Sequence, residues 1–443
     1  MALLASNSGD PARILIVGGG FVGMYTALGL QSKLGDGEAS VTVVDPQTQM
    51  TYQPFLPEAA AGSIEPRHVV VPLRRVLPHC HTVCGRVTGV DHAHRFATIE
   101  NCAGHIEQRG YDVLVMAPGS IARTLPIPGL AEHGIAFKTI GEAIYLRNHV
   151  LSRLEAADAT INLQLRRKLL SFVVIGGGYA GIEVLGELED MARYACRYYE
   201  TIEPKDLRWV LVEATGRIMP EVSPGLGRYT ARRLTQRGIE IFLNTRVTTM
   251  ENGHVVLDNG TEFDADTIVW TAGVKANPVL QQTDLPLDDR KRLRCMATLQ
   301  VVGCPDVFSA GDCAAVPDLT SNDPNATTSP SAQHAVRQAR LLADNVIAHL
   351  RGQPLRHYRH SYAGSVASLG LYQGVAEIYG IRLKGIVAWF MHRTYHLSRM
   401  PTFNRKVRIV ADWTSALLFR REVVALGQIN DPKADFVRAT TAS

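Results

Sequence analysis

Two short stretches decide the fold: residues 13–23 read RILIVGGGFVG, and residues 172–181 read FVVIGGGYAG. Each begins with an apolar run, continues with three consecutive glycines and passes into a helical pattern. A second apolar run follows each stretch and ends in an acid: VTVVD ends at Asp45, and WVLVE ends at Glu213. The order strand, glycine turn, helix, strand is a βαβ unit, and this chain contains it twice. We therefore predict an α/β fold with two Rossmann-like domains.

The first glycine motif has the spacing of a dinucleotide site. Glycines 18, 20 and 23 permit a tight turn, a close approach of backbone to a pyrophosphate, and close packing of the helix, which begins near Phe21. The helix N-terminus then faces the phosphate charge. Asp45 is placed to accept hydrogen bonds from ribose hydroxyls. We predict that this motif binds FAD through Gly18, Gly20, Phe21 and Gly23.

The second motif repeats the spacing with Gly176, Gly178 and Gly181. Glu213 closes its second strand, and a carboxylate there repels the 2′-phosphate of NADP. NADH is therefore favoured over NADPH. Two nucleotide sites in one chain suit electron transfer from a nicotinamide to a flavin, which can release electrons to a different acceptor.

The order of these motifs predicts a glutathione-reductase-like arrangement. We expect an FAD-binding part in 1–125, an inserted NADH-binding domain in 126–290, a second FAD-binding part in 291–380 and an amphipathic membrane-associating region in 381–443. The stretch NGHVVLDNGTEFDADTI is expected to form a β-hairpin with its turn at Asn259 and Gly260.

Composition narrows the class of protein. Of 443 residues, 46% are apolar and 20% are charged, as in ordinary globular proteins. The first residues lack a basic stretch followed by a long apolar one, so no signal peptide is expected. Seven cysteines form no C-x-x-C pair, which favours reduced thiols in a cytoplasm. The group His79, Cys80, His81 and Cys84 is a poor zinc site, because alternate strand residues face opposite ways; no metal is predicted.

The segment from about residue 383 shows amphipathic helical patterns rich in basic residues. Residues 380–425 contain nine Lys or Arg and two acids, a net charge of +7. Aromatic residues beside Lys and Arg are typical of helices that lie in a bilayer interface. We predict peripheral attachment to an anionic lipid surface, at the cytoplasmic face of the cell membrane, through Trp389, Phe390, Arg405, Lys406, Arg408 and Trp413. His392 and His396 are expected on the solvated polar face. The alternative is an apolar face docked on the protein itself or on a second subunit in a homodimer; no motif indicates nucleic acid.

The chain resembles the two-dinucleotide-binding flavoproteins, and above all the type II NADH dehydrogenases, single-subunit NADH:quinone oxidoreductases that do not pump protons. The resemblance runs from about Arg13 to Leu426. Beyond the two glycine motifs it includes TAGV at 271–274, SAGDCA at 309–314, AQHAVRQ at 332–338, GSVASLG at 364–370 and AWFMHRTYHL at 388–397. The resemblance implies a membrane quinone as the electron acceptor.

Residue roles follow from this resemblance. Asp45 and Val87 match residues at the adenosine end of FAD, and Asp312 matches an acid at its ribityl–phosphate part. Glu183 matches a carboxylate near the nicotinamide and flavin, and Gln333 a glutamine beside flavin and quinone. Gly273, in TAGV, is expected to border NADH. The chain departs from the family pattern at Arg337, where glutamine is usual and Gln338 follows, and at Ala363, where lysine is common.

Two alternatives stay open. One is a soluble NAD(P)H:acceptor flavin reductase, and the other is an NADH-sensing interaction protein with little turnover. Disulfide reductases of this fold carry a cysteine pair soon after the first motif, and sulfide:quinone oxidoreductases use paired cysteines, some late in the chain. This chain has no cysteine before Cys80 or after Cys313, so both chemistries are disfavoured.

Overall fold

In a computed structural model, the structure describes residues 11–360, 364–419, 421–425, 433 and 437–439. They form two compact units. The first contains 11–50, 71–121 and 274–360, and the second contains 51–70, 122–273 and the described residues from 364 onward. These units differ from the predicted ranges. The strands that follow residue 363 belong to the second unit, whereas residues 291–360 belong to the first.

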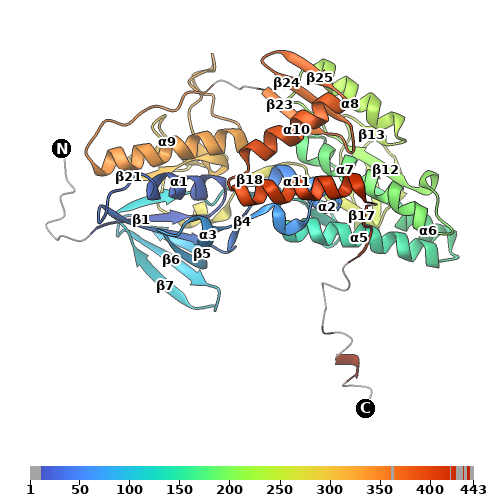
Figure 1. Ribbon diagram of the computed structural model, residues 1–443, viewed down its shortest axis with the longest axis horizontal. Coiled ribbons are helices and arrows are strands. Elements are labelled where there is room, and N and C mark those ends of the chain that lie inside the picture. Colours follow the sequence, from blue (N-terminus) through green and yellow to red (C-terminus); the bar gives the residue numbers. More distant parts are fainter. Residues whose placement is uncertain (1–10, 361–363, 420, 426–432, 434–436, 440–443) are drawn as a thin grey trace. The chain divides into compact units, whose positions relative to one another are not determined.

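The first unit is built on an eight-stranded sheet in the order β20-β21-β8-β1-β2-β5-β6-β7 (Figure 1). Its strands β21, β8, β1, β2 and the first part of β5 are parallel, as the apolar runs predicted, whereas β5, β6 and β7 form an antiparallel meander. The strands are β1 (Ala12–Val17), β2 (Ala39–Asp45), β5 (His81–Asp91), β6 (Phe96–Asn101), β7 (Ile106–Gly110), β8 (Val113–Met116), β20 (Gln300–Val301) and β21 (Cys304–Ser309).

Helices α1 (Phe21–Gln31) and α9 (Ala332–Leu350) pack closely against each other in this unit (Figure 1). A side chain at Gly29 would lie 2.6 Å from Cβ of Ala343, so glycine is needed for this approach. Because α1 directly follows the first glycine turn, this packing fixes the helix N-terminus at the end of the parallel strands.

The second unit has a five-stranded parallel sheet in the order β10-β17-β11-β12-β13. Helices α5 and α7 bury apolar residues in the core beside it. The predicted hairpin is confirmed: β15 and β16 pair in antiparallel register, with Gly260 at a φ of +83° in the turn. The elements are β10 (Gly134–Ala136), β11 (Ser171–Ile175), β12 (Arg208–Val212), β13 (Glu240–Phe242), β15 (His254–Leu257), β16 (Glu262–Asp264), β17 (Thr267–Trp270), α5 (Ile140–Ala159), α7 (Tyr179–Ala195) and α8 (Pro224–Gln236).

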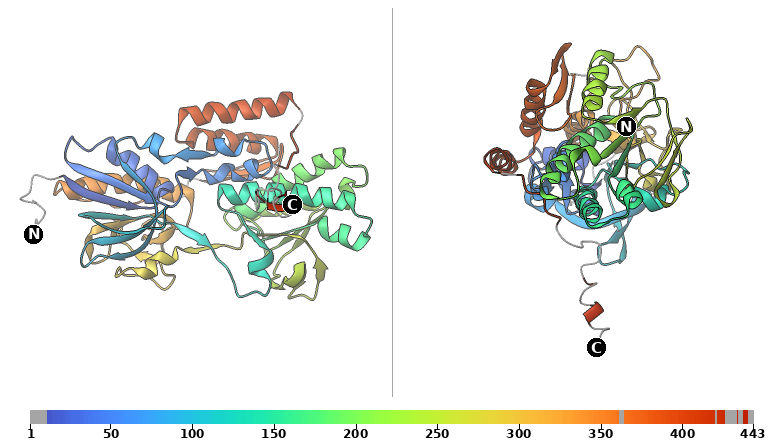
Figure 2. Two further views of the ribbon diagram at one scale, coloured as in Figure 1. Left: turned by 90° about the horizontal axis from the view of Figure 1, so that it is seen from below. Right: turned by 90° about the vertical axis from the view of Figure 1, so that its right-hand side faces the viewer.

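The last part of the second unit is an antiparallel sheet followed by two helices. Strands β23 (Gly364–Ser368), β24 (Gly374–Ile378) and β25 (Ile381–Lys384) lead into α10 (Ile386–Arg399) and α11 (Phe403–Leu418). The helices lie next to each other, and Nζ of Lys406 donates to the carbonyl of Ser398 at 2.9 Å (Figure 1, Figure 2). The helical pattern therefore begins at Ile386, because residues 381–384 complete a sheet.

Candidate functional site

Two glycines of the first motif are required by packing. Gly18 has a φ of +99°, and a side chain there would lie 2.3 Å from the carbonyl oxygen of Ala117. At Gly23 a side chain would lie 1.8 Å from the carbonyl oxygen of Gly18. Any other residue at either position would separate α1 from the strands, so these two glycines set the turn itself.

At Gly20, in contrast, the packing of the described residues does not require a glycine. No protein atom lies within 4 Å of the position where its side chain would be, as far as the described residues reach. It is the N-cap residue of α1, and as a glycine it has no side chain to cap the helix. A space left open at the N-terminus of a helix fits a phosphate group. The turn therefore fits the pyrophosphate of a dinucleotide.

Asp45 organises this turn from the neighbouring strand. Its Oδ2 accepts the N–H of Gly19 at 2.6 Å, and its Oδ1 accepts the N–H of Gln47 at 2.6 Å. Burial raises the pKa of Asp45, and these two hydrogen bonds partly offset that rise. Val87, on β5, is buried in the same unit. Asp45 thus shapes the turn, and its predicted contact with ribose stays a prediction.

The second motif repeats this construction in the second unit. A side chain at Gly176 would lie 2.7 Å from the carbonyl oxygen of Thr271, and one at Gly181 would lie 1.9 Å from that of Gly176. Gly178, before α7, has open space to 3.9 Å. Oε2 of Glu213 accepts the N–H of Gly177 at 2.6 Å, as Asp45 does in the first turn. The two glycine turns, each with the start of its helix and the acid of the next strand, therefore have the same construction. We call them the first and the second cradle.

Gly273 follows strand β17, which ends at Trp270. It has a φ of +93° and is exposed, and its carbonyl accepts the N–H of Arg123 at 3.0 Å. Glu213 also accepts the N–H of Thr215 at 2.8 Å, so both of its oxygens are engaged with backbone. The carboxylate is held in place at the end of β12, where the sequence predicts a ribose contact.

Asp312 lies in a short 3₁₀ helix, Gly311–Cys313, directly after β21. Oγ of Ser120 donates to its carboxylate at 2.6 Å. The N–H of Gly311 donates to Oε1 of Gln338 at 2.8 Å, and this glutamine is fully buried on α9. The departure from the family pattern at Arg337 therefore leaves a glutamine one residue later that supports the Asp312 turn.

Gln333 lies in the first turn of α9 and is half-buried. Its Oε1 is 3.4 Å from Nε2 of His360, and its carbonyl accepts a hydrogen bond from Arg337 at 3.1 Å. It belongs to the first unit, with Asp45 and Asp312. Ala363, the second departure from the family pattern, lies outside the described residues.

Glu183 lies in the first turns of α7, in the second unit, and is buried. Its Oε1 accepts the N–H of Ser368 at 3.1 Å and is 3.1 Å from Nε2 of His392. Burial is the largest single influence on His392 and lowers its pKa. The interaction with Glu183 and the charges of Glu58 and Glu187 outweigh burial, so the net shift is upward.

The same core holds a second ion pair. Arg393 lies 2.9 Å from Oε2 of Glu58, with both side chains buried, and the same oxygen accepts the indole N–H of Trp413 at 2.9 Å. The guanidinium also stacks over the rings of Trp389 and Trp413, at 4.0 and 4.9 Å from their centroids. Arg393 is therefore held by one carboxylate and two aromatic faces.

These contacts correct the predicted orientation of α10. Trp389, His392 and Arg393 are buried together, whereas Ile386, Val387 and Phe390 are exposed. His392 was expected to be solvated but is 1% exposed, and burial together with the neighbouring His392 holds the pKa of His396 well below its usual range. Trp389, expected in the bilayer interface, is 7% exposed. That prediction is wrong for Trp389, because its ring packs on Arg393 within the unit.

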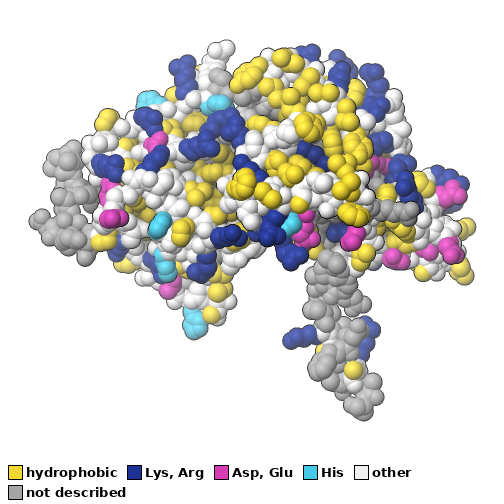
Figure 3. Space-filling view, in the orientation of Figure 1, with side chains coloured by type: hydrophobic (Ala, Val, Ile, Leu, Met, Phe, Trp, Pro, Cys, Tyr) yellow, Lys and Arg dark blue, Asp and Glu magenta, His cyan; other side chains and the backbone are white. Residues whose placement is uncertain are grey.

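The remaining membrane-contact residues divide into two groups. Trp413, expected in the bilayer interface, is half-buried, and its indole N–H donates to Glu58 within the unit. Phe390 is 63% exposed, Arg408 is exposed, and Arg405 and Lys406 are half-buried. Further apolar side chains are exposed on α10, α11 and the neighbouring strand β25, and Figure 3 shows such side chains gathered there. They are Ile381, Ile386, Val387, Phe403, Val407, Val410, Leu417 and Leu418.

Sequence reasoning missed the buried charge cluster. Glu183 and Glu187 are four residues apart on α7, as are His392 and His396 on α10, so each pair lies on one helix face. The sequence alone therefore showed that each pair shares one helix face. Glu58 and Arg393 gave no such signal, because their pairing joins segments more than 300 residues apart.

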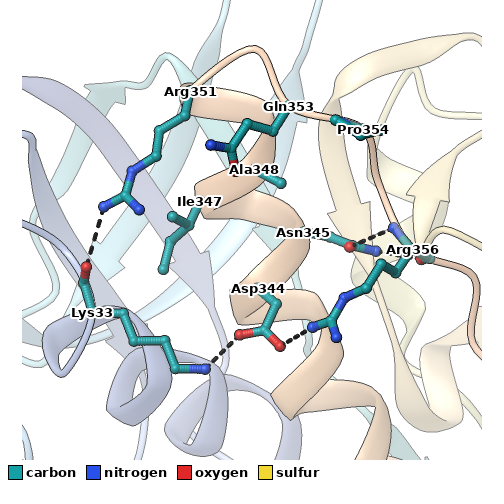
Figure 4. Close-up of a pocket in the computed structure, with 9 residues that line it drawn as sticks. All are labelled: Lys33, Asp344, Asn345, Ile347, Ala348, Arg351, Gln353, Pro354 and Arg356. Carbon is teal, nitrogen blue, oxygen red and sulfur yellow. Dashed lines mark hydrogen bonds and ion pairs between the residues drawn. The ribbon is translucent and has the colours of Figure 1, made fainter.

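A separate pocket of about 500 Å³ lies on the first unit, at the C-terminal end of α9 (Figure 4). Asp344 binds both Lys33 and Arg356, and Arg351 binds Glu38. Each basic group of this pocket already has a carboxylate partner, so the pocket is a charge-paired surface feature distinct from the glycine turns. Across the described residues, no helix is long and apolar enough to cross a membrane, and no cluster of metal-binding side chains is found there.

Comparisons with known proteins agree with this geometry. Residues 12–339 match the pyridine nucleotide-disulphide oxidoreductase family. The chain is 30% identical to the type II NADH:quinone oxidoreductase Ndh of Mycobacterium tuberculosis, over 92% of this chain and 89% of that protein. It is 28% identical to the demethylphylloquinone reductase NdbB of Synechocystis, over 90% of this chain and 95% of that one.

The fold is also found among solved structures. NDH2 from Plasmodium falciparum, solved in complex with NADH, superposes with a TM-score of 0.85 at 18% identity and covers 94% of this chain and 100% of its own. At that identity the likeness concerns the fold. The family match over 12–339 and the 30% identity to a relative that is covered over 89% of its length show that the chain belongs to the pyridine nucleotide-disulphide oxidoreductases and, among them, to the type II NADH:quinone oxidoreductases.

Proposed function

We propose that this chain oxidises NADH and reduces a membrane quinone through FAD, as a peripheral enzyme at the cytoplasmic face of the cell membrane. The observation that carries this proposal is the repeated cradle: Gly20 and Gly178 each leave open space before a helix, and a carboxylate from the next strand orders each turn. Two such cradles fit two dinucleotides. FAD, when bound, accepts electrons from NADH and releases them to a quinone.

The residues of the first unit would hold FAD. The amides at the start of α1 would face its pyrophosphate, and Asp45 would contact the adenosine ribose. Asp312, positioned by Ser120 and by the turn that Gln338 supports, would contact the ribityl–phosphate part. The second cradle and Glu213 would hold NADH, with Gly273 at its border. Gln333 would orient the quinone headgroup.

Quinone reduction also consumes protons, and the second unit contains a pair suited to holding one. Glu183 and His392 are buried and 3.1 Å apart. A carboxylate and an imidazole at that distance can hold and pass a proton between them. We propose that Glu183 and His392 act together in proton supply, while Glu58 is paired with Arg393.

The membrane surface we propose differs from the one the sequence predicted. On α11, the exposed residues Phe403, Val407, Val410 and Leu417 follow one another at intervals of four, three and seven residues, which makes one apolar stripe. Phe390 and its exposed neighbours on α10 add to it. Arg393 does not contribute charge to this surface, because it is buried with Glu58, and Arg421 is half-buried and donates to the carbonyl of Ala61.

Vesicle flotation tests the membrane part. The purified protein should bind vesicles that contain anionic lipid, and the binding should weaken at high salt but persist, because salt screens the charges and not the apolar stripe. Reversing Arg405, Lys406 and Arg408 to Glu should release much of the protein and leave NADH oxidation with a soluble dye intact.

A triple reversal of Arg228, Arg232 and Arg233, on helix α8, is the matched control and should leave vesicle binding unchanged. If the wild-type protein ignores anionic vesicles, or if the reversed protein stays fully bound, the stripe is a subunit interface. The proposed quinone would then lack a route of delivery.

A further inference from the structure

Two cysteines of the first unit face each other across neighbouring strands. In the antiparallel pairing of β5 and β6, Gly85 pairs with Asn101, so the next pair in register is Cys84 and Cys102. The N–H of Cys102 donates to the carbonyl of Cys84 at 3.1 Å, which continues the ladder to this pair. Directly opposed residues of this kind have Cα atoms about 5.5 Å apart, within the range that a disulfide bridges.

The two cysteines are not joined by a disulfide in the structure, and they differ in their access to solvent. Cys102 lies in the tight turn between β6 and β7 and is exposed, whereas Cys84 is half-buried. Burial, and then the interaction with the Cys102 thiol, raises the pKa of Cys84. Cys102 is therefore the thiol that an oxidant in solution reaches first, and Cys84 is the neighbour placed to react with it.

The position of the pair connects it with the first cradle. Cys84 pairs in parallel register with Asp45, on β2, and its Sγ lies 3.8 Å from the carbonyl oxygen of Pro46. Asp45 in turn holds Gly19 of the glycine turn. A covalent bond at Cys84 would thus join the turn after β6 to the strand next to Asp45.

We propose that Cys84 and Cys102 form a reversible thiol–disulfide pair that a peroxide oxidises. The Cys102 thiolate attacks one peroxide oxygen and breaks the O–O bond, which leaves a sulfenic acid on Cys102 and, after protonation, one water from hydrogen peroxide. The Cys84 thiolate then attacks the Cys102 sulfur, the S–O bond breaks, and the oxygen leaves as a second water. Two thiols lose two electrons and two protons in all, and the peroxide is reduced to two waters. A dithiol reductant reverses the reaction by exchange.

The other cysteines serve as internal references. Cys295 and Cys313 are fully buried, and burial raises the pKa of both, that of Cys313 to about 11. Cys80 lies close to Cys84 in sequence, but its Sγ faces Oε1 of Gln31 at 3.9 Å. We therefore expect oxidation to be confined to one pair.

Peptide mapping of the full-length, FAD-loaded protein tests the proposal. After treatment with hydrogen peroxide and then blocking of free thiols, trypsin should release residues 76–86 joined to residues 96–109. The protein should have lost two of its seven free thiols, and dithiothreitol should restore both. Because peptide 76–86 contains both Cys80 and Cys84, the variants decide which one is bonded.

Cys84→Ser and Cys102→Ser should each abolish the joined peptide, whereas Cys80→Ser, the matched control, should retain it. In Cys84→Ser, Cys102 should stop at the sulfenic acid, detected with a dimedone probe. The proposal is overturned if the joined peptide survives in Cys84→Ser, if Cys102 oxidises to sulfinic acid in the wild type without a crosslink, or if the bond forms only between two chains.

Discussion

Nε2 of His392 lies 3.1 Å from Oε1 of Glu183, and both side chains are buried in the second unit. Three carboxylates of that core, those of Glu58, Glu183 and Glu187, act on His392, while Arg393 and His396 are its positively charged and titratable neighbours. Arg393 and Arg421 are the permanent cations near these three carboxylates, so the balance of charge in the core still favours an additional proton. His392 is the group placed to hold it.

The raised pKa of His392 predicts a pH-dependent contribution to stability. A pKa that is higher in the folded than in the unfolded state stabilises the fold below the ordinary value of about 6.5, and this stabilisation is lost as pH rises through the folded pKa. His392→Gln should therefore cost more stability at about pH 6 than at about pH 9, by about 1.4 kcal/mol for each unit of pKa difference. Thermal unfolding midpoints across that range measure it.

His149→Gln is the control of opposite sign. Burial, and then Arg153, lowers the pKa of His149, and its Nε2 lies 3.1 Å from the carbonyl of Asp266. For this residue the wild type should gain stability relative to the variant as pH rises. If the stability difference between wild type and variant changed with pH in the same direction for His392→Gln and His149→Gln, His392 would not hold the proton.

The buried pair of Arg393 and Glu58 predicts a large stability effect. Arg393→Ala leaves the Glu58 carboxylate buried without its cation and should destabilise the second unit by about 3–5 kcal/mol. Replacing both groups, in the double variant Glu58→Gln and Arg393→Met, should restore much of that loss, because no unpaired charge remains. Arg399→Ala, on the exposed end of α10, is the control and should change stability little. Equal losses of stability in Arg393→Ala and in the double variant would contradict this prediction.

The first cradle predicts a loss of flavin. Asp45→Ala removes the acceptor of Gly19, and Asp312→Ala removes the partner of Ser120, so both variants should purify with less FAD. Each lost charge-assisted hydrogen bond is worth about 1.5–3 kcal/mol, enough for about a tenfold or greater loss of affinity. The ratio of flavin to protein absorbance measures this. Asp112→Ala, which breaks an ion pair with Arg13 on the same unit, should keep full flavin; full flavin in both test variants would refute the assignment.

The second cradle predicts the choice of donor. Glu213→Ala should raise the ratio of kcat/KM for NADPH to that for NADH, because it removes repulsion against the 2′-phosphate. Each tenfold change corresponds to about 1.4 kcal/mol. The kcat/KM for each of the two nucleotides should also fall, since Glu213 holds the N–H of Gly177. Glu240→Ala, one strand away and paired with Arg208, should leave the ratio unchanged. A wild type that already prefers NADPH would contradict the charge argument.

How far the sequence predicts this protein depends on the range of the interactions involved. The two glycine turns and their acids were predictable because strand, turn and helix are written within about 40 consecutive residues. Family membership confirms the predicted fold class, the enzyme class and the cofactor pair of FAD and NADH. The orientation of α10 was not predictable by the rule that charge faces water. Arg393 is buried because Glu58, more than 300 residues earlier, and two tryptophans provide its partners.

The central claim is that electrons pass from NADH through FAD to a quinone, and rapid mixing of the purified protein tests it most directly. NADH without acceptor should bleach the flavin absorbance, and a menaquinone or ubiquinone analogue should then restore it within the time of one turnover. Gln333→Ala should slow the second step more than the first, whereas Arg340→Ala, exposed on the same helix, should change neither. A flavin that NADH reduces but no quinone analogue reoxidises faster than oxygen does would contradict the account.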